Sequence, residues 1–317
     1  MDFGFSLPTR GPLANARDIA TLVKRGEALG YEYLTVSDHI VIPKSVAPEY
    51  PYAKDGRLVA PDNWMEQLSV LAWIAALSEK ARLLTSVMVV PHRNPVHTAK
   101  ILSTIDVLSG GRVVLGCGAG WMREEFEALQ TPPFDERGKV TDEYLSIFKE
   151  LWINSQPRFE GRYARFRDIA FEPKPVQKPH IPIWIGGESG AALSRVVKLG
   201  DAWYPIGANP KFPLATAEFY AARARKLDAM AEAGGRDPAT IDRAYVANWP
   251  ETGGPFALED GGRFLCTGTA EQRAEDIQRL AGLGVRHMFF NFLSPTIEET
   301  LERTERFAAE VRPLVTA

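Results

Sequence analysis

The chain is poor in cysteine, and neither cysteine stands in a pattern typical of a metal or redox site. The two, Cys117 and Cys266, lie far apart in the sequence and lack the spacing of metal ligands. We interpret each as a buried, unreactive thiol. Such sparing use of cysteine fits a reducing compartment, so we expect a cytoplasmic protein.

Histidine is also scarce, and its spacing argues against a metal site. The five histidines show no H-x-x-x-H pattern and no accompanying cysteine cluster. Two of them, His92 and His97, frame a turn, and we interpret both as structural. The sequence also lacks G-x-S-x-G, which leaves an α/β-hydrolase nucleophile unsupported. We therefore predict no bound metal and no serine nucleophile.

Long apolar runs and an excess of one charge are missing as well. No uninterrupted apolar run approaches membrane-spanning length. The first residues form a strand-like run with no basic segment before an apolar one, so we expect no signal peptide. A net charge of -3 gives no reason to expect nucleic acid or an anionic membrane as partner. A small molecule is the expected partner.

What the sequence does contain is a regular alternation of strands and helices. Short apolar runs predict strands at 3–7, 33–36, 82–90, 113–115, 181–185, 201–204, 241–248 and 286–291. Helical patterns occupy 15–29, 63–77, 95–109, 139–152, 191–199, 214–233, 269–283 and 295–311, and a further helix starts at 123. Eight strands in strict alternation favour a closed (β/α)8 TIM barrel with insertions over an open doubly wound sheet.

We expect one domain over residues 1–317, with an insertion around 154–180. The insertion has β-like pieces around Gly161 and a proline-rich end, and linker composition is absent, which predicts a hairpin. The composition of residues 43–62 predicts a long loop, and such loops are more often functional than idle. This loop and residues 249–262 would shape a pocket, but they contain no pattern that identifies a substrate.

The active site of such a barrel lies at the carboxyl ends of its strands. The most characteristic strand end lies in residues 112–126, RVVLGCGAGWMREEF. Its glycines, which include Gly118 and Gly120, let a ligand approach the backbone, and Trp121 can wall a pocket. The alternative is a tight turn in which glycine serves packing alone. The spacing differs from the dinucleotide fingerprint G-x-G-x-x-G.

Two other strand ends carry candidate chemistry. Gly186, Gly187, Glu188 and Ser189 precede a helix, whose N-terminal N–H groups and dipole suit a phosphate. Glu188 would contact the phosphate through its amide, and Ser189 through its hydroxyl unless it only caps the helix. The pair Asp38 and His39 suits proton transfer, with a hydrogen-bonded structural pair as the alternative. The aromatic residues that can line an apolar pocket are Tyr50, Tyr52, Trp64, Trp121, Trp203 and Trp249, with Trp64 also a candidate for the core.

Six segments together resemble the bacterial luciferase-like flavin and deazaflavin oxidoreductases, most closely the subgroup that uses the deazaflavin coenzyme F420. They are YLTVSDHIVIP (33–43), RLLTSVMVVPHRNPVHTAK (82–100), SGGRVVLGCGAGWMREEF (109–126), ERGKVTDEYLSIFKELW (136–152), FEGRYARF (159–166) and EPKPVQKPHIPIWIGGES (172–189). The resemblance covers nearly the whole chain and implies a (β/α)8 barrel with insertions. It also implies a homodimer.

The resemblance implies roles for individual residues. Ser86 and Val87 match the family position of a non-proline cis peptide that supports the flavin-type ring. The turn 186–189 matches the phosphate-binding turn. Asp38 and His39 match an acid–histidine pair near the reacting ring edge, in which the histidine donates a proton or a hydrogen bond.

The sequence also departs from some relatives at one loop. Certain relatives carry an acid after the fourth strand, and luciferases carry an arginine there that faces the FMN phosphate. This chain has Ala119, Gly120 and Trp121 at that place. The difference argues against a sugar-phosphate dehydrogenase mechanism and favours F420 over FMN.

The resemblance therefore implies an F420-dependent oxidoreductase. Hydride would pass between the deazaflavin and a small organic substrate, at an activated C=C bond, a carbonyl or an alcohol, and His39 would handle the proton. One alternative is a monooxygenase of the same family that uses reduced FMN. A second alternative is a flavin-binding protein without catalytic activity.

Overall fold

The computed structural model describes residues 1–44, 63–247, 258 and 262–315. The barrel is closed, because β1 pairs with β11 and β3 pairs with β5, all in parallel. The barrel strands, in chain order, are β1 (Asp2–Ser6), β2 (Tyr33–Val36), β3 (Arg82–Thr85), β5 (Val113–Gly118), β8 (Ile183–Gly186), β9 (Ala202–Tyr204), β10 (Asp242–Ala247) and β11 (His287–Phe290). The predicted (β/α)8 barrel is thus confirmed, and the open-sheet alternative is excluded.

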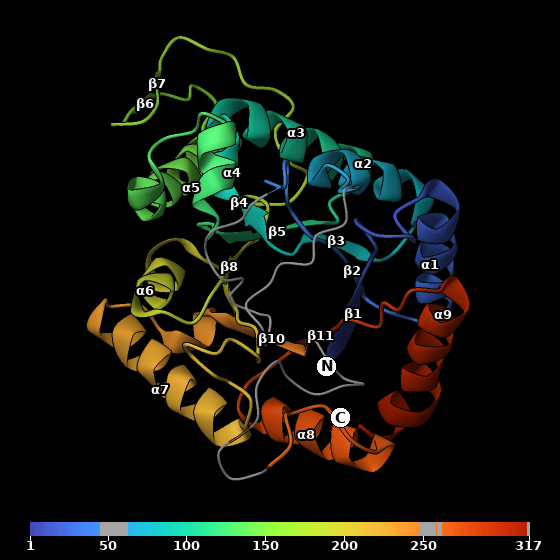
Figure 1. The fold of residues 1–317 in the computed structure, drawn as a ribbon. Helices are drawn as coiled ribbons and strands as arrows, with labels where there is room; N and C mark the ends of the chain where they lie inside the picture. The colour runs from blue at the N-terminus through green and yellow to red at the C-terminus, as the bar shows by residue number, and fades with distance from the viewer. Residues whose placement is uncertain (45–62, 248–257, 259–261, 316–317) are drawn as a thin grey trace.

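Helices form the outer layer of the barrel (Figure 1). They are α1 (Ala16–Ala28), α2 (Gln67–Leu77), α3 (Pro95–Leu108), α4 (Arg123–Ala128), α5 (Arg137–Ile153), α6 (Gly190–Leu199), α7 (Ala217–Ala233), α8 (Ala270–Gly282) and α9 (Ile297–Arg306). Most are capped as their sequence predicts; Thr269, for example, forms a complete capping box with Gln272. No helix in the described ranges is long and apolar enough to cross a membrane.

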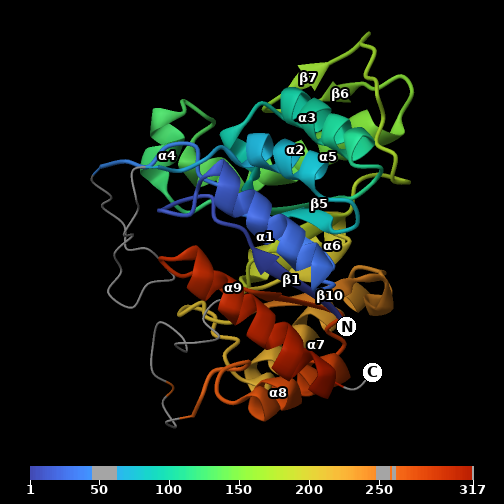
Figure 2. The same cartoon turned by 90° about the vertical axis from the view of Figure 1, so that its right-hand side faces the viewer.

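The insertion forms the expected hairpin. Strands β6 (Phe159–Glu160) and β7 (Arg165–Phe166) pair antiparallel in a sheet of their own. The hairpin lies at the periphery of the molecule in both Figure 1 and Figure 2, near α3 and α5. It therefore leaves the carboxyl ends of the barrel strands open.

The predicted third strand, 82–90, is divided in the structure. A cis peptide joins Ser86 to Val87 after the end of β3. The short β4 (Met88–Val89) then pairs with the end of β5, and a 3-10 turn follows at Val90–His92. The cis peptide that the family resemblance implied is present. Apolar periodicity alone could not show this break, because it carries no information on the isomer of a peptide bond.

Helix α2 begins later than predicted. Residue 63 was expected to start it, but Asn63 instead exchanges hydrogen bonds with the backbone of Gly11, and Trp64 forms a β-bridge with Arg10. The helix begins at Gln67, and the carboxylate of Glu66 caps it by accepting the N–H of Ser69. Trp64 is thus placed at the rim of the barrel and not in a helical core stripe.

The interior of the barrel is filled below the site. Large buried side chains from non-adjacent strands meet inside the barrel, as Tyr33 of β2 and Trp184 of β8 do with ring centroids 5.5 Å apart. Phe289 packs edge-to-face on Tyr33 and Tyr204. This layer closes the inside of the barrel, so a ligand can enter only from the carboxyl ends of the strands.

Candidate active site

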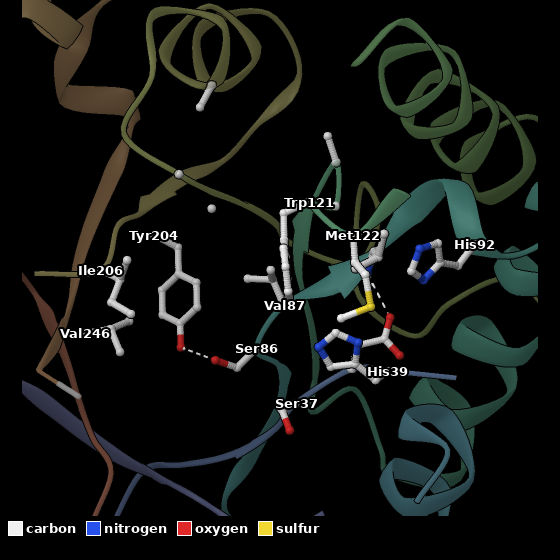
Figure 3. Close-up of a pocket in the computed structure, with 18 of the residues that line it drawn as sticks. Ser37, His39, Ser86, Val87, His92, Trp121, Met122, Tyr204, Ile206 and Val246 are labelled. Carbon is white, nitrogen blue, oxygen red and sulfur yellow. Dashed lines mark hydrogen bonds between the residues drawn. The ribbon is translucent and has the colours of Figure 1, made fainter. Parts of the chain in front are cut away.

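A cavity of about 660 Å³ opens among the carboxyl ends of the strands (Figure 3). This volume is in the range of small-molecule and cofactor sites. The residues that the sequence predicted as catalytic or cofactor-binding all belong to its lining: Asp38, His39, Ser86, Val87, Gly118, Gly120, Trp121, Gly186, Gly187, Glu188 and Ser189. The structure therefore gathers these residues from strand ends that are far apart in the sequence.

His39 is held by a carboxylate that the sequence analysis did not identify. Its Nδ1 lies 2.8 Å from Oε2 of Glu125, and both side chains are buried. Glu125 lies on α4, and its Oε1 accepts the backbone N–H groups of Ile40 and Val41 at 2.7 and 3.3 Å. Since Nδ1 is engaged by the carboxylate, Nε2 is the nitrogen of His39 that remains for a ligand.

The charge state of Glu125 fixes the tautomer of His39. Burial alone would raise the pKa of this carboxyl, but the hydrogen bond and charge of His39 hold its pKa below the ordinary value. An ionised carboxylate only accepts hydrogen bonds, so Nδ1 of His39 must carry the proton between them. Residues 119–121 contain no acidic side chain, but the helix that follows them, α4, contains Glu125, which bonds to His39.

Asp38 has a different partner from the one predicted. Its carboxylate accepts both terminal nitrogens of Arg93, at 2.8 and 2.7 Å, and the backbone N–H of Val89 at 2.8 Å. The alternative of a hydrogen-bonded pair between Asp38 and His39 is therefore wrong, because each side chain has its own partner. Neighbouring residues in extended backbone point to opposite sides, which sends the two side chains to different partners. Asp38 joins the end of β2 to the segment after β4.

Two indole rings and a second histidine surround His39. The ring of Trp64 lies edge-to-face at 4.4 Å between centroids, and Trp121 lies at 6.4 Å. His92 has its Nδ1 3.8 Å from Oε1 of Glu125, and neither of its ring nitrogens has a hydrogen-bond partner. Burial lowers the pKa of His92 to about 4, which keeps its ring neutral.

One wall of the cavity consists of small residues around a single valine. A Cβ at Gly118 or Gly186 would lie 3.1 Å from a methyl group of Val87, so glycine at both positions lets this side chain stand between them. Next to it, the hydroxyl groups of Ser86 and Tyr204 are 2.9 Å apart and share a hydrogen bond (Figure 3). The wall is therefore flat around Val87 and polar at one side.

The predicted phosphate-binding turn, residues 186–189, has a backbone conformation that requires glycine. Two of its side chains, those of Glu188 and Ser189, also stabilise the local structure. Gly187 has φ +100°, a conformation that favours glycine. Ser189 caps α6, because its hydroxyl accepts the N–H of Ala192 at 3.2 Å. The buried carboxyl of Glu188 accepts the N–H of Ile206 at 2.8 Å and the amide of Asn209 at 2.5 Å. This burial raises the pKa of Glu188 to about 7.

Basic side chains stand next to this turn. Arg195 of α6 pairs with Asp142 and donates to the carbonyl of Gly138. Arg137, at the start of α5, donates to the carbonyl of Gly120 at 3.1 Å and forms no ion pair in the part of the chain that the structure describes. Both arginines line the cavity. Arg137 therefore supplies a positive charge that Ala119 does not.

Sequence patterns could not reveal several of these residues. Glu125 bonds to His39 and Arg93 bonds to Asp38, and these partners are 86 and 55 residues apart in the sequence. A local motif cannot predict contacts over such separations. Among the proposed aromatics, Trp203 lies in the core against Tyr220 and does not line the cavity. Tyr50, Tyr52, Trp249 and most of the two loops lie outside the described residues.

A metal is not indicated by the geometry. The described ranges contain no group of three or more His, Cys, Asp or Glu side chains that could hold an ion. Both cysteines are buried, and burial raises the pKa of the Cys117 thiol to about 12 and raises that of Cys266 as well.

Comparison with known proteins identifies relatives of the chain. The family model described as luciferase-like monooxygenase matches residues 1–248. The FMNH2-dependent dimethylsulfone monooxygenase of Pseudomonas putida is 29% identical over 299 residues, which cover 80% of this chain and 79% of that protein. Among solved structures, the monooxygenase RslO1 of Streptomyces bottropensis has a TM-score of 0.77 at 20% identity over all of both chains. An F420-dependent secondary alcohol dehydrogenase, in complex with an F420-acetone adduct, has a TM-score of 0.76 at 18% identity and covers 100% of this chain and 99% of that one.

Proposed function

Because the chain belongs to the luciferase-like monooxygenase family, we propose that it is an F420-dependent oxidoreductase. It transfers hydride between the deazaflavin and a small organic substrate. The reacting group of the substrate is an activated C=C bond, a carbonyl or an alcohol. His39 handles the proton that accompanies the hydride.

The observation that carries this proposal is the hydrogen bond between His39 and Glu125 at the cavity. Reduction of a carbonyl or of an activated C=C bond requires a proton as well as a hydride. Glu125 orients the imidazole through Nδ1, so Nε2 is the nitrogen that can deliver or accept that proton. Trp64 and Trp121 border the imidazole and limit the access of water.

The cavity also fits a planar ring with a phosphate-bearing tail. Gly118 and Gly186 leave no side chain beside Val87, so a flat ring can approach this wall closely. The turn 186–189 would hold the phosphate at the N-terminus of α6, next to Arg137. When bound, the deazaflavin supplies a ring carbon that gives or takes hydride. The protein supplies orientation, a proton and a partly enclosed site.

A reduced-FMN monooxygenase is the second candidate. The Pseudomonas putida relative, which is named as FMNH2-dependent, aligns over most of both chains. Arg137 also favours this candidate, because it provides a cation near the loop where luciferases have their phosphate-binding arginine. The turn 186–189 would bind the phosphate of F420 or that of FMN equally well. The two functions therefore differ in the ring that is bound, deazaflavin or flavin, and in whether oxygen is a substrate.

A side-by-side titration with oxidised F420 and FMN tests the cofactor. Binding is followed by quenching of tryptophan fluorescence, and Trp121→Phe identifies the share of the signal that comes from the cavity. We expect F420 to bind at least about tenfold more tightly than FMN. Tighter binding of FMN than of F420, together with oxygen uptake when reduced FMN is supplied, would contradict this proposal. The protein would then be a reduced-FMN monooxygenase.

Turnover is then measured without oxygen, as loss of the F420 absorbance on addition of secondary alcohols or as reoxidation of reduced F420 by enones and ketones. His39→Ala should abolish either reaction while F420 binding persists. An unchanged rate in His39→Ala would exclude the proton role. Bound F420 with no reaction for any of these substrates would favour a non-catalytic flavin-binding protein.

A further inference from the structure

Among the described residues, Arg10 has no carboxylate partner, as is also true of Arg137 in the cavity lining. It follows β1, is half-buried and lines the cavity. Three acidic side chains of the described residues in this part of the site are engaged elsewhere: Asp38 and Glu66 with Arg93, and Glu125 with His39. No ion pair of Arg10 exists within the described ranges, so its charge is uncompensated by the protein there.

The guanidinium of Arg10 is nevertheless held in place. Its Cζ lies 4.7 Å from the centroid of the Trp64 ring, in a cation–π contact. The backbone around it is fixed by the β-bridge between Arg10 and Trp64, and the N–H of Met65 donates to the carbonyl of Thr9 at 2.8 Å. The side-chain amide of Asn63 also exchanges two hydrogen bonds with the backbone of Gly11, next to Arg10. A cation placed in this way is preorganised for an anion.

The position of Arg10 assigns that anion to the substrate and not to the cofactor phosphate. Going round the closed sheet, β1 stands four strands from β8 in either direction, so the loop that carries Arg10 faces the phosphate turn across the barrel mouth. A phosphate at that turn has another cation available, because Arg137 lines the same cavity. The guanidinium of Arg10 and the imidazole of His39 both contact the indole ring of Trp64.

We propose that Arg10 binds a carboxylate of the substrate, so that the enzyme acts on small organic acids whose C=C, carbonyl or hydroxyl group lies a few atoms from the carboxylate. This inference rests on the proposed function for the reaction, but the binding site stands on the geometry of Arg10 and Trp64 alone. The planar guanidinium binds a carboxylate through two parallel hydrogen bonds. The reacting group of the same molecule then lies at His39.

Binding of a matched pair of probes tests the inference without cofactor or turnover. Butyrate and butyramide have nearly the same shape and differ in charge. We expect calorimetric titration of the whole protein to show butyrate binding about 10- to 100-fold more tightly than butyramide. Arg10→Met should abolish this preference and leave butyramide binding unchanged, whereas Arg10→Lys should keep part of it.

The control substitution is Arg17→Gln, which removes an arginine that is 84% exposed and outside the cavity. It should retain the full preference for butyrate. Inorganic phosphate is titrated in parallel, and its affinity for the turn at 186–189 should be the same in Arg10→Met as in the unmodified protein. Equal binding of butyrate and butyramide by the unmodified protein would overturn the inference, as would a preference that survives in Arg10→Met. Failure of F420 and FMN to bind would overturn the proposed function but leave this result standing.

Discussion

At the scale of single residues, the orientation of His39 depends on Glu125. Glu125→Gln keeps the shape of the side chain but can place an amide N–H against Nδ1, which forces the proton of the imidazole onto Nε2. We expect kcat to fall about 100-fold or more, the usual range for loss of general acid–base catalysis. The affinity for the cofactor should change little, because Glu125 contacts the histidine and the backbone.

Steady-state kinetics and a cofactor titration on the same preparation separate these two effects. Glu127→Gln is the matched control, because it makes the same change at an exposed position of α4. It should leave kcat unaltered. If Glu125→Gln lowered cofactor affinity and kcat in proportion, Glu125 would be a structural support of the cavity and not a positioning residue for His39.

Glu188 makes stability depend on pH. Burial raises the pKa of this carboxyl to about 7 in the folded protein, from an ordinary value of 4.5. The folded state therefore binds the proton more tightly, so the stabilising contribution is full below pH 4.5 and is lost as pH rises through 7. Glu188→Gln removes this titration. The free energy of unfolding of the unmodified protein, relative to Glu188→Gln, should fall by roughly 2–3 kcal/mol between pH 4.5 and 8.

Urea denaturation of both proteins across this pH range measures the difference, in which the contributions of all other groups cancel. Curves that run parallel would show that Glu188 titrates in the same way in both states. Its role would then be limited to the hydrogen bonds with Ile206 and Asn209.

The residues of the site were predicted unevenly from the sequence. Those at strand ends, such as His39 and Gly187, were found because the barrel topology itself gathers strand ends. Their partners were not, because Glu125 lies on a helix beyond the glycine-rich turn and Arg93 precedes a helix. A local motif gives the position of a side chain along an element, but a hydrogen bond depends on how two elements pack.

At the scale of elements, the turn between β8 and α6 is the part of the site that backbone conformation controls most directly. Gly187 has φ +100°, and a Cβ there would lie 3.3 Å from that of Ala192. Gly187→Ala should therefore lower the free energy of unfolding by about 1–3 kcal/mol. It should also weaken cofactor binding about tenfold or more, because relief of the strain moves the N–H groups of the turn.

Gly190 offers a matched control in the same turn. It has space for a Cβ, with no atom within 4 Å, and lies at the first position of α6. Gly190→Ala should keep cofactor affinity and stabilise the protein by up to about 1 kcal/mol, because alanine favours the helix. Denaturation curves and cofactor titrations of both variants test this pair. Equal cofactor affinity in the two variants would show that the phosphate of the cofactor does not bind at this turn.

Most elements could be predicted from the sequence because their signals are local. Apolar runs, caps such as Thr269 and turn glycines gave the barrel strands and the outer helices in the correct order. The errors lie where distant contacts override local preference. Residues 63–66 have a helical pattern, yet they pair with residues 9–11 and form the rim that holds Trp64.

At the scale of the whole molecule, closure of the barrel depends on one tight contact between β3 and β5. The pairs Leu83–Val113 and Leu84–Val114 complete the ring. Just beyond them, a Cβ on Gly116 would lie 2.1 Å from the backbone oxygen of Thr85. The hydroxyl of Thr85 also donates to the carbonyl of Gly116 at 2.7 Å. Strand count alone left an open sheet possible, because this seam is a contact between distant residues.

Gly116→Ala should therefore destabilise the molecule as a whole. Since a backbone atom obstructs the added methyl group, β3 and β5 must separate, and we expect a loss of about 2–4 kcal/mol in the free energy of unfolding. Gly282→Ala at the end of α8, where no atom lies within 4 Å, should change stability by less than about 0.5 kcal/mol. Thermal unfolding followed by circular dichroism compares the two, with Tm lower by roughly 5–10 °C in Gly116→Ala alone. A Tm for Gly116→Ala that matches Gly282→Ala would mean that the contact between β3 and β5 adapts to a side chain, and that closure of the barrel does not require glycine at this position.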